Sequence, residues 1–363
     1  MDIQGVTQTP RQATYADHSD PAPAPPEMSA MGQSAFQPVD VLERSFKTLN
    51  RHLQRMLECS ADTIGRLKSL AAEGLAKMDL AEAFEQIHAK RTRSQLWSLQ
   101  LRQCSAAMTG CMSALDETRL RQLESKQGEI LRDLKVHLDK DKPIEIAEAL
   151  DASINSSNDF FEKLLELIDL IKNGYLAGYE HIIAAYSDFF ADFNAEITAQ
   201  MKDWIEGAND GKDVKLDAGA LRAALTRLIE KYSHPNPASV LFPKPGEGGA
   251  SKDEAEKWLK ALGLPGRCLK PNGDGTWCVV IDLDPLNLMK SGLPASGGTV
   301  TWDTAKYNQW QTGFNAQEER MKNLLQSLTQ KYSNANAYHD NFNKTLSAHL
   351  NQFADMLRAM LNF

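Results

Sequence analysis

The prolines of this 363-residue chain are concentrated in two regions. Six of the 15 lie at or before Pro38, eight lie between Pro235 and Pro294, and the remaining one is Pro143. Long helices require proline-free sequence, because proline lacks the backbone N–H and clashes with the preceding turn. Such sequence is found in three tracts: 39–142, 144–234 and 295–363. This distribution excludes an all-β fold and disfavours a regular alternation of strands and helices.

Two of these tracts carry apolar residues at steps of three and four, the period of an amphipathic helix. The first run covers 157–206 and the second covers 302–363. Each helix would extend ~65 Å or more, which exceeds the diameter of a single-core domain, so each needs a partner of similar length. We therefore predict a long antiparallel intramolecular coiled coil, with a coiled coil between different chains as the alternative. The predicted seam consists of Ile168, Tyr175, Tyr179, Ile182, Tyr186, Phe190, Phe193, Trp310, Phe314, Leu324, Leu328 and Phe342.

The other regions flank or interrupt these two helices. Apolar residues at helical spacing across 38–138 predict an N-terminal helical hairpin, followed by a linker at 139–156. The glycine-rich stretch 207–301 contains short strand and helix patterns, which predict a small α+β insertion. Residues 1–37 are rich in Pro, Ala, Gln, Thr and Ser without a periodic apolar face, so we expect a disordered leader. The predicted fold class is therefore mainly α.

Local signals place several element ends. We expect the first long helix to be capped by one of the consecutive residues Ser156, Ser157 and Asn158, and the second by Asp303. Within the insertion, Asp217 is expected to cap a helix after a strand at 214–216. Further expected features are a capping box of Ser251 and Glu254, a β-hairpin over 268–281 around the turn Asn272–Gly275, a short helix from Pro285 and a strand at 299–301.

The sequence lacks the signatures of an enzyme. Neither dinucleotide- or phosphate-binding glycine loops nor metalloprotease or serine-hydrolase motifs occur, so we predict a non-enzymatic protein without a cofactor or metal. His339 and His349 lie ten residues apart, which is not a metal-pair spacing, and are expected on the solvated surface. Five cysteines without C-x-x-C spacing argue against zinc. Cys268 and Cys278 could either form a disulfide across the predicted hairpin or pack as free thiols in its strands, and the sequence does not decide between these alternatives.

Net charge and hydropathy limit the classes of partner that this protein is expected to bind. A formal net charge of -8 argues against nucleic acid as a ligand. No stretch approaches the ~18 apolar residues of a membrane-spanning helix, and the N-terminus lacks the layout of a cleaved secretion signal. The last helix is unusually rich in asparagine, a poor helix former, so a recognition face is proposed there beside the default of a solvated face. Its polar residues include Asn334, Asn336, Asp340, Asn341 and Asn343.

Several segments resemble a known family. They are AKYNQWQTGFNAQEE (305–319), QKYSNAN (330–336), DGKDVKLD (210–217), LFP (241–243) and KWLKALGLP (257–265). These segments resemble the hydrophilic needle-tip proteins of type III secretion systems, in the branch of the invasion proteins IpaD, SipD and BipD. The resemblance covers about 179–345, while residues 1–140 fit only in layout and the end from 346 to 363 departs from the family pattern.

The resemblance implies a secreted protein that caps the extracellular needle, after a cytoplasmic pool before export. It would control secretion and support assembly of the membrane translocators. Implied partners are the needle subunit, the translocators, further copies in a homo-oligomeric ring and, as in enteric members, bile salts. The N-terminal hairpin would act as a built-in chaperone that keeps the protein monomeric before assembly. For the needle contact we select Lys331, Tyr332, Asn334, Asn336, Asp340 and Asn341.

Two other classes of function are alternatives. A secreted effector or coiled-coil adaptor acting on a host protein is the main alternative, and an effector enzyme would need a nucleophile beside a base, which the sequence does not present. A pore-forming translocator would need apolar helices of membrane length, which the sequence lacks.

Overall fold

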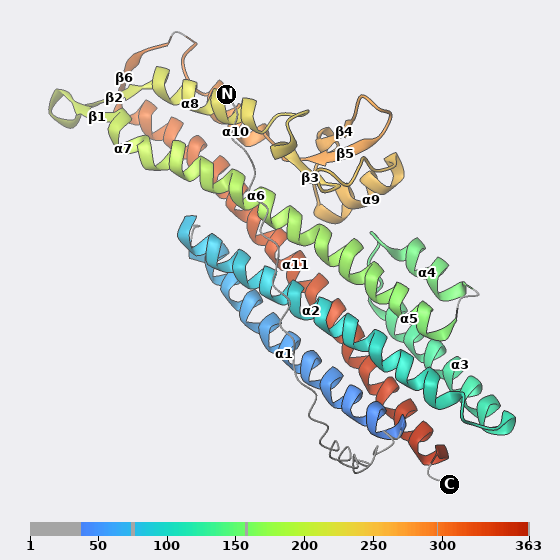
Figure 1. Cartoon of the computed structure of the whole chain (residues 1–363). Coiled ribbons are helices and arrows are strands. Elements are labelled where there is room, and N and C mark those ends of the chain that lie inside the picture. Colours follow the sequence, from blue (N-terminus) through green and yellow to red (C-terminus); the bar gives the residue numbers. More distant parts are fainter. Residues whose placement is uncertain (1–37, 74–76, 157–158, 296, 362–363) are drawn as a thin grey trace, which may run out of the picture. The chain divides into compact units, whose positions relative to one another are not determined.

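The computed structural model describes residues 38–73, 77–156, 159–295 and 297–361, and this part of the protein is mainly α, as predicted (Figure 1). The predicted leader at 1–37 and the expected break near Gly74 lie outside the described residues. The α-helices are α1 (Pro38–Glu73), α2 (Lys77–Met112), α3 (Glu117–Lys140), α4 (Ala147–Asn155), α5 (Phe160–Asp169), α6 (Ala177–Glu196), α7 (Met201–Trp204), α8 (Ala218–Lys231), α9 (Lys252–Leu262), α10 (Asp284–Ser291) and α11 (Thr304–Leu361). The strands are β1 (Ile205–Ala208), β2 (Asp213–Asp217), β3 (Val240–Phe242), β4 (Leu269–Pro271), β5 (Trp277–Val280) and β6 (Thr299–Asp303).

The two predicted arms pack on each other within the chain. The second arm is α11, which runs for 58 residues and is capped as predicted, the Lys306 N–H donating to Asp303 Oδ1 at 2.9 Å. The first arm is segmented into α5, the π-helical segment η1 (Leu170–Leu176) and α6, and all three contact α11 or each other. A short 3-10 turn, η2 (Thr198–Gln200), and α7 continue it, so the single helix predicted over 157–206 is interrupted, and its last two residues begin β1 instead.

The start of the first arm differs from the prediction. Asp159 is its N-cap, and its side chain accepts a hydrogen bond from the Phe161 N–H at 3.2 Å. Ser156 instead ends α4, while residues 157 and 158 lie outside the described residues. An aspartate accepts this bond as readily as a serine or asparagine, so propensity alone did not separate the candidates.

The N-terminal region contains more helix than predicted. Helices α1 and α2 pair as the expected hairpin (Figure 1), and α1 packs on α11. The stretch up to residue 138 also contains a third helix, α3, whose buried Leu123, Ile130, Leu134 and Leu138 repeat at helical spacing. It packs on α11 as well. The expected linker at 139–156 holds α4, which contacts α5, because Leu150 and Ile146 are buried there.

The insertion is an α+β module with two small antiparallel sheets. One sheet has the order β1-β2-β6 and the other the order β3-β5-β4. Strands β2, β4, β5 and β6, and helices α8, α9 and α10, lie where the sequence predicted them, whereas β1 and β3 were not predicted. Asp217 caps α8 by accepting from the Ala220 N–H, and Ser251 caps α9 by accepting from the Glu254 N–H. Cys268 and Cys278 are both buried free thiols, which leaves the packing alternative.

A carboxylate network ties the insertion to the second arm. Asp282, which follows β5 and is 6% exposed, accepts from Arg267 Nε at 2.9 Å and from Arg320 Nη2 of α11 at 3.1 Å. Both arginines also reach Asp284, at 2.9 and 3.5 Å. Bonds of this kind, with both groups charged, are stronger than neutral hydrogen bonds, so the network fixes the position of the module on α11.

Candidate functional site

Some of the residues predicted for the needle contact are exposed or half-buried, and the others are buried. Asn334 and Asn341 are exposed on α11 and Lys331 is half-buried. Tyr332, Asn336 and Asp340 are buried. The structure therefore does not present the six residues as one face. The reason is that α11 is covered on more than one side, by α1 and α2 on one and by α3 and the first arm on others.

The two exposed asparagines border a hollow between α11 and the end of α3. It measures about 540 Å³ and has a mixed lining of cations, carboxylates and aromatic rings. Tyr338 lines it, donating from its hydroxyl to the Leu138 carbonyl at 3.2 Å and meeting the Tyr175 ring edge-on at 6.0 Å. The lining residues are His137, Lys140, Asp141, Tyr175, Asn334, Ala337, Tyr338 and Asn341.

The buried part of the predicted face belongs to a polar cluster beneath the α1–α2 hairpin. Lys90 of α2 is 1% exposed, and its Nζ lies 3.6 Å from Asp340 Oδ1 of α11. The next residue, Arg91, places its Nη2 3.2 Å from Oε2 of Glu180 on α6. Consecutive residues of one helix diverge by about 100°, so this pair reaches both arms of the coiled coil at once. We call these residues and their neighbours the polar cluster: Lys90, Arg91, Ser94, Glu180, Tyr332, Asn336, His339, Asp340 and Asn343.

His339 corrects a prediction, since it is fully buried at the centre of the cluster rather than solvated. Its Nε2 accepts from Asn343 Nδ2 at 3.0 Å and lies 3.4 Å from Ser94 Oγ, while its Nδ1 lies 3.3 Å from Asp340 Oδ1. These contacts fit a neutral imidazole that carries its proton on Nδ1. Burial lowers the pKa of His339, with Asp340 opposing, so the ring stays neutral near pH 7.

Several polar atoms of the cluster have no hydrogen-bond partner among the residues that the structure describes. They are Lys90 Nζ, the Tyr332 hydroxyl, Asn336 Oδ1 and Asn343 Oδ1, and each belongs to a side chain that is at most 1% exposed. An unpaired buried polar group costs about 1–3 kcal/mol, so this concentration is unusual for a stable interface. The hydrogen-bonding groups at the contact between the hairpin and the coiled coil are therefore incompletely paired.

The charges in the cluster are shifted by burial in both directions. Burial raises the pKa of Glu180 to about 7, although Arg91, Lys90 and Lys244 oppose the shift. Burial likewise lowers the pKa of Lys90 against the pull of Asp340 and Glu180. For Asp340 burial acts upward, but the hydrogen bond with His339 and the charge of Lys90 bring its pKa below the usual value. The ion-pair partners of Glu180 and Lys90 therefore do not fully compensate these two side chains for the hydration that they lose on burial.

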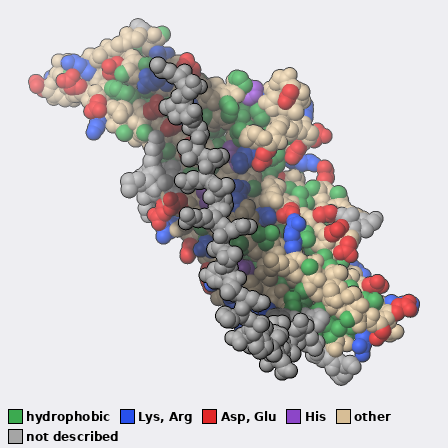
Figure 2. All heavy atoms as spheres, viewed as in Figure 1, with side chains coloured by type: hydrophobic (Ala, Val, Ile, Leu, Met, Phe, Trp, Pro, Cys, Tyr) green, Lys and Arg blue, Asp and Glu red, His purple; other side chains and the backbone are tan. Residues whose placement is uncertain are grey.

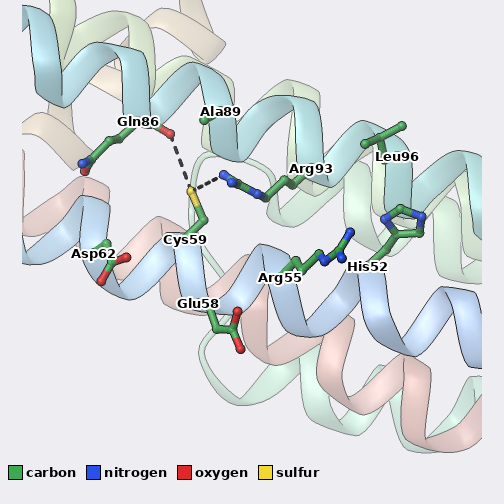
Figure 3. A pocket seen from close by; sticks show the side chains of 9 residues that line it. All are labelled: His52, Arg55, Glu58, Cys59, Asp62, Gln86, Ala89, Arg93 and Leu96. Carbon is green, nitrogen blue, oxygen red and sulfur yellow. Dashed lines mark hydrogen bonds between the residues drawn. The ribbon is translucent and has the colours of Figure 1, made fainter.

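A second hollow, of about 600 Å³, lies between α1 and α2 (Figure 3). Cys59 of α1 points into it, and the Arg93 guanidinium donates to its Sγ at 2.9 Å while Sγ itself lies 3.9 Å from the Gln86 carbonyl. Cations and carboxylates are mixed along its walls, as they are across the face shown in Figure 2, so neither surface selects one sign of charge. The lining residues are His52, Arg55, Glu58, Cys59, Asp62, Gln86, Ala89, Arg93 and Leu96.

The predicted seam residues are mostly found in the core. Ile168, Tyr175, Tyr179, Ile182, Tyr186, Phe190, Phe193, Phe314, Leu328 and Phe342 are buried, whereas Trp310 and Leu324 are half-buried. Direct contacts across the arms include Phe193 with Phe314, whose ring centroids lie 6.4 Å apart, and the Tyr186 hydroxyl, which donates to the Met321 carbonyl at 3.2 Å. Tyr179 instead contacts Trp258 of the insertion and donates to Glu145 Oε1.

Among residues 38–73, 77–156, 159–295 and 297–361, His, Cys, Asp and Glu side chains do not gather in groups of three or more that suit a metal ion. No helix in the same ranges combines the length and apolar character needed to cross a membrane.

Comparison with solved structures identifies a similar fold. The crystal structure of the Pathogenicity island 1 effector protein from Chromobacterium violaceum aligns with a TM-score of 0.60 at 26% sequence identity. The alignment covers 88% of this chain and 97% of that one.

Curated relatives are similar over part of their length. The chain is 39% identical over 211 residues to the cell invasion protein SipD of Salmonella typhi, which is 57% of this chain and 62% of that protein. It is 37% identical over 212 residues to the invasin IpaD of Shigella flexneri, covering 57% of this chain and 61% of that protein. The translocator protein BipD of Burkholderia thailandensis is 30% identical over 200 residues. The chain thus matches less than two thirds of the length of SipD and IpaD.

The family match is broader than these pairwise alignments. Residues 57–361 match the family described as type III secretion systems tip complex components, a range that includes most of the hairpin, both arms and the insertion. The segments that first indicated the resemblance, in α11, β2 and α9, all fall within it. The chain belongs to the family of type III secretion systems tip complex components.

Proposed function

We propose that this chain is the hydrophilic tip protein of a type III secretion needle. In this role it would leave the bacterium through the secretion system, cap the needle outside the cell as a homo-oligomeric ring, and serve there as the platform for the translocators. The observation that carries the proposal is the family match over residues 57–361. The names of the similar proteins, two invasion proteins and a translocator protein, support a place in the same process.

In this proposal the arms and the insertion contact different partners. The two arms, α5–α6 and α11, would face the needle subunit through α11, where Asn334 and Asn341 are already exposed. The insertion would face the translocators. Tyr332, Asn336 and Asp340 would join the needle contact only after the α1–α2 hairpin has moved, because it contributes to covering them in the isolated chain. A bile-salt ligand stays a prediction from the resemblance.

The role at the needle is tested by deleting the gene and measuring both protein secretion and pore formation in host membranes. We expect unregulated secretion and loss of pores, restored by the intact gene. Normal pore formation in the deletion strain would overturn the proposal.

The masking role of the hairpin is tested separately, with purified protein lacking residues 1–112. Removing α1 and α2 exposes α11 surface that they bury, so we expect self-association that rises with concentration in multi-angle light scattering. Protein lacking only residues 1–37 is the matched control and should remain monomeric. A hairpin deletion that retains its helical circular dichroism and stays monomeric at every concentration would contradict the mask.

A further inference from the structure

The polar cluster places one acidic side chain from each arm beneath the same helix. Glu180 of α6 is 8% exposed and Asp340 of α11 is 7% exposed. In the isolated chain, α2 fills both positions with two consecutive basic residues, Lys90 and Arg91. Charges are rarely buried at such depth unless they are paired, so the acidic pair requires cations from whatever covers the arms.

The occupant supplied by α2 fits the cluster incompletely. Within the described ranges Lys90 Nζ has no hydrogen-bond partner, and its 3.6 Å contact with Asp340 Oδ1 is a long ion pair. Acceptor oxygens on the neighbouring Asn336 and Asn343 also go without donors. An arginine at this place would offer five N–H donors in a planar fork, which suits a carboxylate flanked by amide oxygens better than a lysine does.

The remaining contacts of the hairpin with α11 include further polar bonds. Asn50 Oδ1 of α1 accepts from Ser347 Oγ at 3.0 Å and from Asn351 Nδ2 at 3.1 Å. Toward the first arm, Arg102 Nη2 of α2 lies 3.5 Å from Asp169 Oδ2 of α5. Polar contacts lose less than apolar ones when water or another polar group replaces them, so these bonds can be exchanged for those of a competing helix. The hairpin also buries apolar side chains such as Phe46 and Trp97, so that helix must bring apolar groups as well.

We propose that the two arms carry a docking surface, centred on Glu180 and Asp340, for a partner helix that presents two adjacent basic side chains, with arginine preferred opposite Asp340. The pair Lys90–Arg91 occupies this surface within the chain and competes with the partner. The inference rests on the proposed function in one respect, namely that the hairpin is a displaceable cover.

The test uses fluorescein-labelled peptides of residues 84–101, which present the Lys90–Arg91 pair on one helix, and fluorescence anisotropy as the readout. The receptor is the full chain with Lys90→Gln and Arg91→Gln, so that its own hairpin competes weakly. Three peptides are compared: the natural sequence, one with both basic residues changed to Gln, and one with Lys90→Arg. We expect the natural peptide to bind roughly tenfold tighter than the Gln peptide and the Lys90→Arg peptide to bind tightest, with both advantages shrinking as salt is added.

Receptor variants locate the binding surface. Adding Glu180→Gln and Asp340→Asn should abolish the preference for the basic peptides, whereas Glu319→Gln and Asp355→Asn, at exposed positions of α11, should preserve it. Circular dichroism checks that each receptor is folded. Where a receptor variant does not fold, the wild-type chain replaces it, and the natural peptide should raise hydrogen exchange in α2 more than the Gln peptide does.

Three results would each overturn the inference: equal affinity for all peptides, absence of binding by all of them, or a preference that survives in the Glu180→Gln, Asp340→Asn receptor. These outcomes are independent of the needle-tip proposal, whose test is the secretion and pore phenotype of the deletion strain. If the deletion strain shows the expected phenotype but the receptor binds all peptides equally, the docking surface is refuted and the needle-tip proposal stands.

Discussion

Replacing Glu180 with Gln should remove a large pH dependence from the stability of this protein. Burial raises the pKa of this carboxyl from 4.5 to about 7 in the folded chain. The difference of roughly 2.5 pKa units corresponds to roughly 3 kcal/mol at 1.36 kcal/mol per unit. Because the residue is only 8% exposed, solvent screens little of this effect.

The sign follows from proton linkage. Between pH 4.5 and 7 the folded chain holds a proton on Glu180 that the unfolded chain has released, so the free energy of unfolding falls as pH rises through this window. The stabilising contribution of Glu180 is complete below pH 4.5 and lost above pH 7. A glutamine at this position has no such proton. We therefore expect Glu180→Gln to gain roughly 3 kcal/mol relative to wild type between pH 4.5 and 8.

The assay is urea unfolding followed by circular dichroism at half-unit steps from pH 4.5 to 8. Glu43→Gln, at an exposed position of α1, is the matched control and should run parallel to wild type. The carboxyl carbon shift of selectively labelled glutamate gives the pKa of Glu180 directly. Parallel pH profiles for wild type and Glu180→Gln, or a titration near pH 4.5, would refute the reasoning.

Three further substitutions test the packing described above, each by thermal and urea unfolding. Gly178→Ala should destabilise by about 1–3 kcal/mol, because the added Cβ would lie 2.7 Å from the Trp258 ring, whereas Gly174→Ala, with its nearest such contact at 3.6 Å, should be tolerated. Asp282→Asn should cost about 2 kcal/mol by weakening the bonds to Arg267 and Arg320, and more than Asp284→Asn, whose side chain is 37% exposed; equal effects would contradict the buried network. Tyr186→Phe should cost about 1 kcal/mol through loss of the bond to the Met321 carbonyl, and an unchanged stability would show that this bond contributes nothing.

The architecture was largely predictable because its signals are periodic and long. Proline-free runs with apolar residues at helical spacing predicted both arms and the hairpin, and Asp303 and Asp217 marked helix starts correctly because an aspartate cap acts locally. Strands β1 and β3 were not predicted, since four- and three-residue strands are too short to show a period. Strands β4 and β5 are as short, but the turn Asn272–Gly275 between them indicated a hairpin. Helix α4 was not predicted, because a proline and many polar residues in 139–156 gave no apolar period from which the burial of Leu150 could be inferred.

The candidate site was harder to predict, because burial of polar residues depends on what covers them. A run of Asn, His and Asp on one helix is typical of a solvated face, and the sequence of α11 gives no sign that α2 lies over His339 and Asp340. The signal that could have found the cluster is the presence of Lys90 and Arg91 on the stripe of α2 that carries Ile87, Trp97 and Leu101. Pairing them with Glu180 and Asp340 needs the tertiary arrangement, since those partners lie far along the chain.

The two arms differ in regularity, and this bears on how each tolerates a change of length. In α11 the helix is uninterrupted over 58 residues, so inserting or deleting one residue would rotate everything beyond it by about 100° and misplace every side chain that faces the first arm. The first arm contains the π-helical turn Leu170–Leu176, in which the helix already accommodates extra chain. A single-residue deletion within that turn can be absorbed by its conversion to α-helix. Length variation among related chains should therefore gather in the first arm and spare the second.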